Sequence, residues 1–134
     1  MWTCENCGRI FKKERQIHSC QKVTIGSHFI NKERAKELFD YLLKRIEKNI
    51  GKCKVISLPC CIHLFGNYDF LAALPKRDKI EIRFALDRVL KSQRLKIAVL
   101  LSSKTFKNCF DIHSKQEIDH EFMSWIKESY FLKS

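Results

Sequence analysis

The sequence predicts an α+β fold, in which an antiparallel or mixed sheet is packed with an N-terminal and a C-terminal helix and is preceded by a small module. Three observations lead to this prediction. The 134 residues suffice for one ordinary core and a small appendage. Four Cys and His side chains gather within the first 20 residues. Several strand-like segments then follow one another between two amphipathic helices, which favours α+β over a doubly wound parallel sheet.

The N-terminal module contains Cys4, Cys7, His18 and Cys20 in the spacing C-x2-C-x10-H-x-C, and Gly8 follows the second thiol directly. Three thiolates and one imidazole are a standard closed ligand set for tetrahedral Zn²⁺. So short a segment cannot bury a core of its own, whereas zinc binding contributes on the order of 10–16 kcal/mol to the folding of such a module. We therefore predict a structural Zn²⁺ ion, because protein side chains fill all four coordination positions.

The boundary between module and domain lies in a polar connector near residues 21–27. Residues 1–27 thus form the Cys3His zinc-binding module with its connector, and residues 28–134 form the α+β domain. We expect Trp2 and Phe11 to pack beside the ion, because the module has few other large apolar residues. The odd number of 7 Cys excludes a complete disulfide framework, which favours metal ligation of the clustered thiols.

The first helix of the domain is predicted to begin at Asn31, as its N-cap, and to stop at Gly51. Between them, apolar residues recur at intervals of three and four, which lines one face of a helix. These residues are Ala35, Leu38, Phe39, Leu42, Leu43, Ile46 and Ile50.

The region after this helix is predicted to form strands. Two short strands joined at Pro59 are expected between Lys54 and Phe65, followed by a turn at Gly66 and Asn67. Residues 68–78 are expected to be irregular or a short strand that ends at Pro75.

Residues 79–86 alternate apolar and polar side chains, which predicts a strand with one buried face and one wet face that carries Glu81 and Arg83. Residues 96–101 fit either a buried strand or the end of a helix that starts near Ser92, because a short apolar run cannot be assigned by periodicity alone.

The last strand is expected to place Phe106, Asn108, Phe110 and Ile112 on one side, with Lys107, Cys109 and Asp111 opposite. The final helix is predicted to open at Ser114 with a capping box that Glu117 completes. Its apolar stripe consists of Ile118, Phe122, Trp125, Ile126 and Tyr130.

The charge distribution suggests an anionic partner. The formal net charge is +11, and most of the excess lies between Lys76 and Lys107. We predict a polyanion-binding face formed by Lys76, Arg77, Lys79, Arg83, Arg88, Lys91, Arg94 and Lys96. Such a field attracts phosphate backbones through counterion release without reading sequence. A solvated lysine-rich surface is the alternative interpretation of the same charges.

Enzyme motifs are absent from the sequence: there is no P-loop, dinucleotide-binding glycine pattern or nucleophile elbow. Cys60 and Cys61 lie in an apolar segment, where we expect them to be buried as small hydrophobes. Cys61 and His63 would share a strand face, but a second metal site there would need two more ligands. With Asp69, these two residues are the candidates for a catalytic site in the domain.

Targeting segments are also missing. No apolar run approaches the ~20 residues that a membrane helix needs, and the first residues lack the apolar core of a secretion signal. We therefore expect a cytoplasmic protein without membrane association.

Several stretches of the chain resemble one known family. They are Trp2–Lys12, Gln16–Cys20, His28–Phe29, Glu37–Phe39, Asp69–Ala72, Leu74–Arg77, Ile80–Leu86, Ile118–Asp119, Trp125–Ile126 and Tyr130. Together they resemble the bacterial family called domain of unknown function 5655 with the short zinc module that precedes it. The resemblance implies an α+β fold and a metal, with no established activity. The chain departs from it at Thr105–Cys109, where such proteins often carry a basic or histidine-containing strand.

Three functional hypotheses follow from the sequence. The first is a non-enzymatic, zinc-stabilised protein whose basic face binds nucleic acid, without sequence preference, or another polyanion. The second is a protein-interaction or scaffold module that uses the zinc unit and exposed aromatic residues such as Tyr68 and Phe70. The third is an enzyme with a pocket that contains Cys61, His63 and Asp69. We favour the first, because charge is the functional feature that the sequence quantifies.

Overall fold

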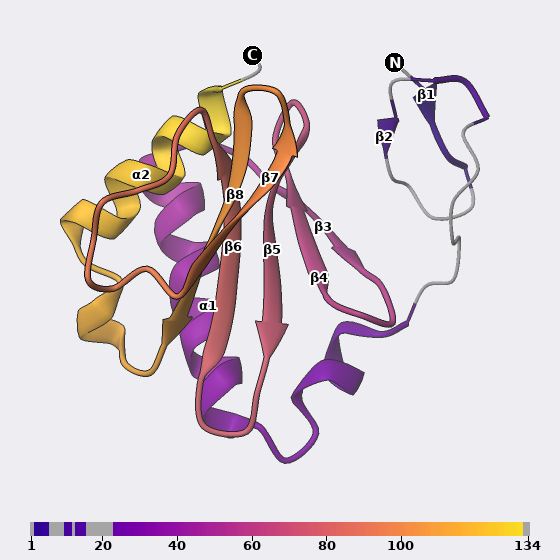
Figure 1. The fold of residues 1–134 in the computed structure, drawn as a ribbon. Helices are drawn as coiled ribbons and strands as arrows, with labels where there is room; N and C mark the ends of the chain where they lie inside the picture. Colours follow the sequence, from indigo (N-terminus) through magenta and orange to yellow (C-terminus); the bar gives the residue numbers. More distant parts are fainter. Residues whose placement is uncertain (1, 6–9, 12, 16–22, 133–134) are drawn as a thin grey trace.

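A computed structural model describes residues 2–5, 10–11, 13–15 and 23–132 of the chain. Its centre is a six-stranded sheet in the order β3-β4-β5-β6-β8-β7, with every neighbouring pair antiparallel. The helices α1 (Glu33–Asn49) and α2 (His120–Phe131) lie on the same side of this sheet (Figure 1). The predicted α+β class is confirmed. The strands are β3 (Lys54–Ser57), β4 (Ile62–Phe65), β5 (Asp69–Pro75), β6 (Ile80–Leu86), β7 (Ile97–Ser102) and β8 (Thr105–Ile112).

The N-cap of helix α1 lies one residue later than the sequence predicts. Asn31 is not its cap, because its backbone takes the left-handed conformation with φ of 59°. Lys32 occupies the N-cap position without a side-chain capping bond. At the other end the backbone N–H groups of Ile50 and Gly51 both donate to the carbonyl of Ile46, at 2.8 and 3.0 Å. Most of the predicted apolar stripe is buried along the sheet, with Leu42 and Ile46 fully enclosed and Leu43 and Ile50 partly buried.

Gly51 and Gly66 both lack a side chain where the ring of Tyr130 approaches the backbone. A Cβ at Gly51 would lie 2.6 Å from Tyr130 Oη, and one at Gly66 would lie 2.6 Å from Tyr130 Cε2. The tyrosine hydroxyl donates to the carbonyl of Lys52 at 2.9 Å. Gly51 therefore serves close packing as well as helix termination, and the Tyr130 ring connects the end of α2 to the loop between α1 and β3 and to the turn between β4 and β5.

Helix α2 uses a different cap from the predicted one. Ser114 leads into a 3₁₀ turn (Lys115–Glu117) and makes no side-chain capping bond. The chain leaves helical geometry at Ile118, and Asp119 then caps α2 by accepting from the Phe122 N–H at 2.9 Å. The Glu117 carboxylate accepts instead from the backbone N–H of His113 at 2.7 Å. The predicted capping box at Ser114 is wrong, because an aspartate five residues later takes its role.

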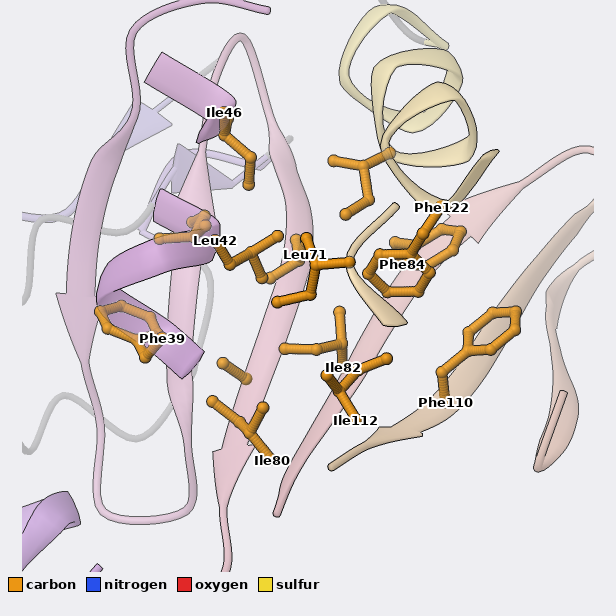
Figure 2. Close-up of a cluster of buried hydrophobic side chains, with 14 of the residues drawn as sticks. Phe39, Leu42, Ile46, Leu71, Ile80, Ile82, Phe84, Phe110, Ile112 and Phe122 are labelled. Carbon is orange, nitrogen blue, oxygen red and sulfur yellow. The ribbon is translucent and has the colours of Figure 1, made fainter. Parts of the chain in front are cut away.

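The core lies between the sheet and the two helices and is rich in aromatic rings (Figure 2). Phe84 stacks on Phe110 with ring centroids 5.5 Å apart, and Phe122 meets both rings edge-on at 5.7 and 5.4 Å. Trp125 also stacks on Phe110, with ring centroids 5.5 Å apart. These rings join β6, β8 and α2 in one packed unit.

The opposite face of the sheet, which we call the open face, differs from the sequence prediction at β6. Ile80, Ile82 and Phe84 point to the core as predicted. Glu81 was expected on a wet face, yet it is 4% exposed. Its carboxylate is enclosed by the side chains of Arg83 and Lys96, which pair with it.

The segment that the sequence pattern leaves undecided between strand and helix forms the strand β7, and this strand is not buried. It lies at the sheet edge beside β8. The exposed fractions of Ile97, Val99, Leu100 and Leu101 range from 41 to 60%.

The N-terminal segment forms a small ribbon in which β1 (Trp2–Thr3) pairs antiparallel with β2 (Ile10–Phe11). The rings of Trp2 and Phe11 lie 5.9 Å apart. Ile10 packs against a second cluster of buried residues on the sheet, formed by Ile56, Leu58 and Phe65. The connector continues to this edge, where the Val23 N–H donates to the carbonyl of Ser57 at 3.2 Å.

Candidate metal centre

The turn between β3 and β4 brings two thiols beside a histidine. Pro59 interrupts the strands, and the Leu58 N–H closes the turn by donating to the Cys61 carbonyl at 3.0 Å. Cys60 therefore lies in the turn and is exposed, while Cys61 is 8% exposed. Strand alternation places Cys61 and His63 on one side of β4, the open face, because Ile62 and Leu64 belong to the core.

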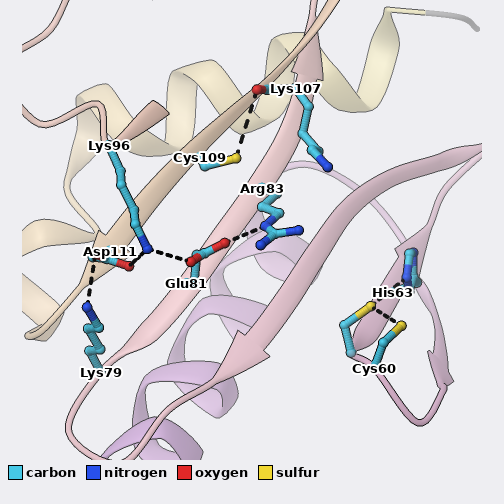
Figure 3. Close-up of polar contacts among 10 residues, drawn as sticks. Cys60, His63, Lys79, Glu81, Arg83, Lys96, Lys107, Cys109 and Asp111 are labelled. Carbon is cyan, nitrogen blue, oxygen red and sulfur yellow. Dashed lines mark hydrogen bonds and ion pairs between the residues drawn. The ribbon is translucent and has the colours of Figure 1, made fainter. Parts of the chain in front are cut away.

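The three side chains form a compact group (Figure 3). Cys60 Sγ lies 2.9 Å from Cys61 Sγ, and Cys61 Sγ lies 3.0 Å from His63 Nε2. One ligand atom from each residue lies within 4.8 Å of the other two. Two thiols and an imidazole are soft or borderline donors of the kind that Zn²⁺ prefers. The group can hold a metal ion.

Asp69, at the start of β5, fixes the orientation of the histidine ring. Its Oδ2 lies 2.7 Å from His63 Nδ1. When Nδ1 carries the hydrogen, Nε2 presents a lone pair toward the thiols. A metal-binding histidine commonly donates its second N–H to a carboxylate, which sets the tautomer and the ring angle. Asp69 thus has the position of an outer-shell partner of a metal site.

The geometry requires only a small opening to accept zinc. With Zn–S bonds of about 2.3 Å, tetrahedral coordination separates two sulfurs by roughly 3.8 Å. Cys60 lies in an exposed turn, so rotation about its side-chain bonds can supply the extra separation. Three protein ligands leave a fourth position for water or another ligand, as in catalytic zinc sites.

Burial opposes ionisation of the central thiol in the absence of a cation. It raises the pKa of Cys61 to about 12, and the hydrogen bond with Cys60 and the charge of Asp69 act in the same direction. The same contacts also resemble a catalytic arrangement in which Cys61 is the nucleophile, His63 is the base and Asp69 orients the base. A thiol held in its protonated form is a poor nucleophile, whereas a metal ion replaces that proton on binding.

A hollow of about 140 Å³ adjoins the group on the open face, and His63 and Asp69 form part of its wall. The small side chains of Ala72 and Ala85 line it, and Leu101 of β7 contributes to its wall. Two cations complete the lining, Arg83 from β6 and Lys107 from β8. Among the described residues, no acid pairs with Lys107.

A network of paired charges crosses the open face beside this hollow (Figure 3). Arg83 and Lys96 hold the Glu81 carboxylate, with Lys96 Nζ 2.8 Å from Oε1. Lys79 Nζ lies 3.0 Å from Asp111 Oδ2, and Lys96 reaches the same carboxylate at 3.5 Å. Burial alone would raise the pKa of Glu81, but hydrogen bonds from Lys96 and Arg83 lower it overall. The acids therefore remain ionised and neutralise much of the local positive charge.

The structure divides the eight residues of the predicted polyanion-binding face between two sides of the fold. Lys79, Arg83 and Lys96 lie in the network of the open face. Arg88 pairs with Glu128 of α2, and Arg94 pairs with the α2 cap Asp119.

The other three predicted residues, Lys76, Arg77 and Lys91, are exposed, and within the described part of the chain none of them makes an ion pair. The predicted residues thus do not form one continuous unpaired surface, because acids from α2, β6 and β8 pair with five of them.

The four predicted zinc ligands of the N-terminal module are described only in part. Cys4 is 5% exposed and follows β1. Cys7, His18 and Cys20 lie outside the described residues. The described part of this segment is the ribbon of β1 and β2, in which the rings of Trp2 and Phe11 lie 5.9 Å apart.

Sequence reasoning missed Cys60 as a candidate ligand. It treated Cys60 and Cys61 as two buried residues of one strand, in which successive side chains point to opposite faces. Cys60 does not follow this alternation because it lies in the turn, so its sulfur can approach the sulfur of Cys61. The signal in the sequence was Pro59, which ends the first strand immediately before the two thiols.

Comparison with known proteins identifies a family that covers most of the chain. A family model described as "Domain of unknown function (DUF5655)" matches residues 25–133. No curated protein and no solved structure matches the chain. Within the described residues, neither helix has the length and apolar character needed to cross a membrane.

Proposed function

Because the chain belongs to the DUF5655 family, whose description states no activity, we propose a function from its own residues: it is a zinc-binding protein with a metal centre at Cys60, Cys61 and His63. The observation that carries this proposal is the alignment of Asp69, His63 and Cys61, which directs Nε2 at two adjacent sulfurs. Zinc bound there supplies a Lewis acid with one exchangeable position, next to a hollow that contains Arg83 and Lys107.

We further propose that the N-terminal module binds its own structural zinc ion through Cys4, Cys7, His18 and Cys20. The low exposure of Cys4 and the pairing of β1 with β2 support it. A closed site of four protein ligands and an open site of three differ in role: the first holds a segment folded, and the second presents a coordination position to a ligand.

Metal content separates the two sites. We expect the purified chain to contain two zinc ions, and the double substitution Cys60→Ser with Cys61→Ser to leave one. The double substitution Cys7→Ser with Cys20→Ser is likewise expected to leave one, because each pair removes two of the thiolates that bind a single ion. Elemental analysis of untagged protein measures these ratios.

The matched control uses the two remaining thiols of the domain, Cys53 and Cys109, which lie outside the group of possible ligands. Cys53→Ser with Cys109→Ala should retain both ions. Unchanged zinc content after substitution of Cys60 and Cys61 would show that these two thiols do not bind the metal.

Binding of a polyanion is the second candidate function. The observation that favours it is a set of cations without acidic partners among the described residues: Lys76 and Arg77 in the turn before β6, Lys91 in the loop before β7, and Lys107 at the hollow. Unpaired cations contribute more to phosphate binding than paired ones, whose counter-charge stays on the protein. These four residues, rather than the five paired ones, are therefore proposed as the principal sites of phosphate binding.

We expect affinity for a mixed-sequence DNA duplex to fall steeply between about 50 and 200 mM salt. Combined replacement of Lys76, Arg77 and Lys107 by alanine should reduce the slope of log K against log salt by about 0.9 for each phosphate that the protein no longer neutralises. Arg88→Ala is the matched control, because Arg88 already pairs with Glu128. Fluorescence anisotropy across a salt series checks this, and absence of binding at the lowest salt would reject this second function.

A further inference from the structure

We propose that two copies of the chain associate through the outer edges of their β7 strands, which would join the two sheets into one. This proposal is independent of the metal centre. It rests on the position of β7 at the end of the sheet order, where its inner edge pairs with β8 and its outer edge is not paired with any described strand.

The composition of β7 is that of an interior strand. Ile97, Ala98, Val99, Leu100 and Leu101 form an uninterrupted apolar run, typical of strands buried on both faces. In the single chain these residues are largely exposed, at 55% for Ile97, 60% for Leu100 and 54% for Leu101. Four of the eight large apolar residues that the described chain exposes therefore lie in this one strand.

The two edge strands of the sheet, β3 and β7, differ in how far other described residues of the chain cover them. Along β3, the connector donates a hydrogen bond from Val23 to Ser57, and Ile10 covers the adjoining cluster. An unprotected apolar edge pairs readily with another strand, so proteins usually blunt it with charges, proline or a bulge. From Ile97 to Leu101, β7 contains neither charge nor proline, and its one irregularity is the register shift between Leu100 and Ser102.

The sequence of β7 is complementary to itself in the antiparallel direction. A two-fold axis at Val99 places Val99 opposite its own copy, Ile97 opposite Leu101, and Ala98 opposite Leu100. Every pair is aliphatic, and such cross-strand pairs stabilise a sheet.

The charged flanks also fit this register. Lys96 would meet Ser102 of the other copy, so like charges do not face each other along the strand. A register centred one residue earlier would instead oppose Lys96 to Leu100. The axis at Val99 therefore fits a second copy better than this shifted register does.

Mass measurement by light scattering after size exclusion tests the association. In moderate salt, which screens the repulsion between two basic chains, the wild type should show twice the mass of one chain. Val99→Lys should restore the mass of a single chain, because two ammonium groups would then be opposed at the axis. Val89→Lys is the matched control: Val89 is similarly exposed, at 44%, but lies outside β7, so the doubled mass should persist.

A second variant tests the register independently of any loss of folding. Val99→Cys should form a disulfide-linked dimer under mild oxidation, well above the wild-type background from the native thiols, whereas Val89→Cys should not. A wild type that remains at the mass of one chain at high concentration would overturn the proposal. So would a Val99→Lys chain that is folded and still doubled, or a stoichiometric different protein seated on the strand.

Discussion

The double substitution Cys7→Ser with Cys20→Ser is expected to unfold the N-terminal module while leaving the domain of residues 28–134 folded. Zinc binding contributes on the order of 10–16 kcal/mol to such a module, which is too short to bury a core of its own. Trp2 reports the change, because its ring packs against Phe11 in the ribbon of β1 and β2. Its side-chain resonance should move to a random-coil position, and thermal unfolding of the domain should shift only slightly.

The wild type in strong chelator provides a second route to the same state, and Cys53→Ser provides a thiol control outside the module. If the Trp2 resonance stays dispersed in both the double variant and the chelated wild type, the module does not depend on a metal.

Replacing Phe84 with alanine is expected to lower the free energy of unfolding of the domain by about 3–5 kcal/mol. The ring is 1% exposed and packs on Phe110 and Phe122, so its removal leaves a cavity at the junction of β6, β8 and α2. Such a decrease is a large share of the roughly 5–15 kcal/mol by which domains are stable. Urea denaturation measures it.

Phe131→Ala is the matched control for this core substitution. Phe131 is 48% exposed near the end of α2 and meets the ring of Tyr130 edge-on at 5.0 Å. Its removal should cost about 1 kcal/mol or less. Equal decreases in the two variants would contradict the assignment of Phe84 to the centre of the core.

Most elements of the fold could be predicted because periodicity reports burial. The apolar stripe of α1, the break at Pro59 and the alternation from Ile80 to Leu86 each follow from one local pattern. Predictions failed where a neighbour from elsewhere in the chain decides the outcome. Glu81 is buried because Lys96 and Arg83 enclose it, and α2 begins at His120, directly after its cap Asp119, whose carboxylate also pairs with Arg94.

The strand β7 illustrates a second kind of limit. Its apolar run predicts burial on both faces, and the order of strands in the sheet places it at an edge instead. Sequence pattern indicates what surroundings a segment favours, but strand order depends on pairings over long distances in the chain. The mismatch between the two is what suggests a partner for this strand.

The candidate site could be predicted only in part. Strand alternation predicts that Cys61 and His63 share one face, and Asp69 is a candidate residue of the same site. The sequence pattern indicates too few ligands there for a metal ion. The missing thiol was Cys60, because its direction depends on the turn geometry after Pro59 rather than on strand alternation. The predicted basic face likewise required knowledge of which lysines and arginines meet acids across the fold.

Anomalous diffraction from crystals of the untagged protein, at energies on both sides of the zinc absorption edge, tests the central claim most directly. The metal centre predicts a peak about 2.3 Å from the sulfurs of Cys60 and Cys61 and about 2.0–2.1 Å from His63 Nε2. Asp69 should remain bonded to the opposite ring nitrogen. A zinc peak in the N-terminal module, with none between these three side chains, would contradict it.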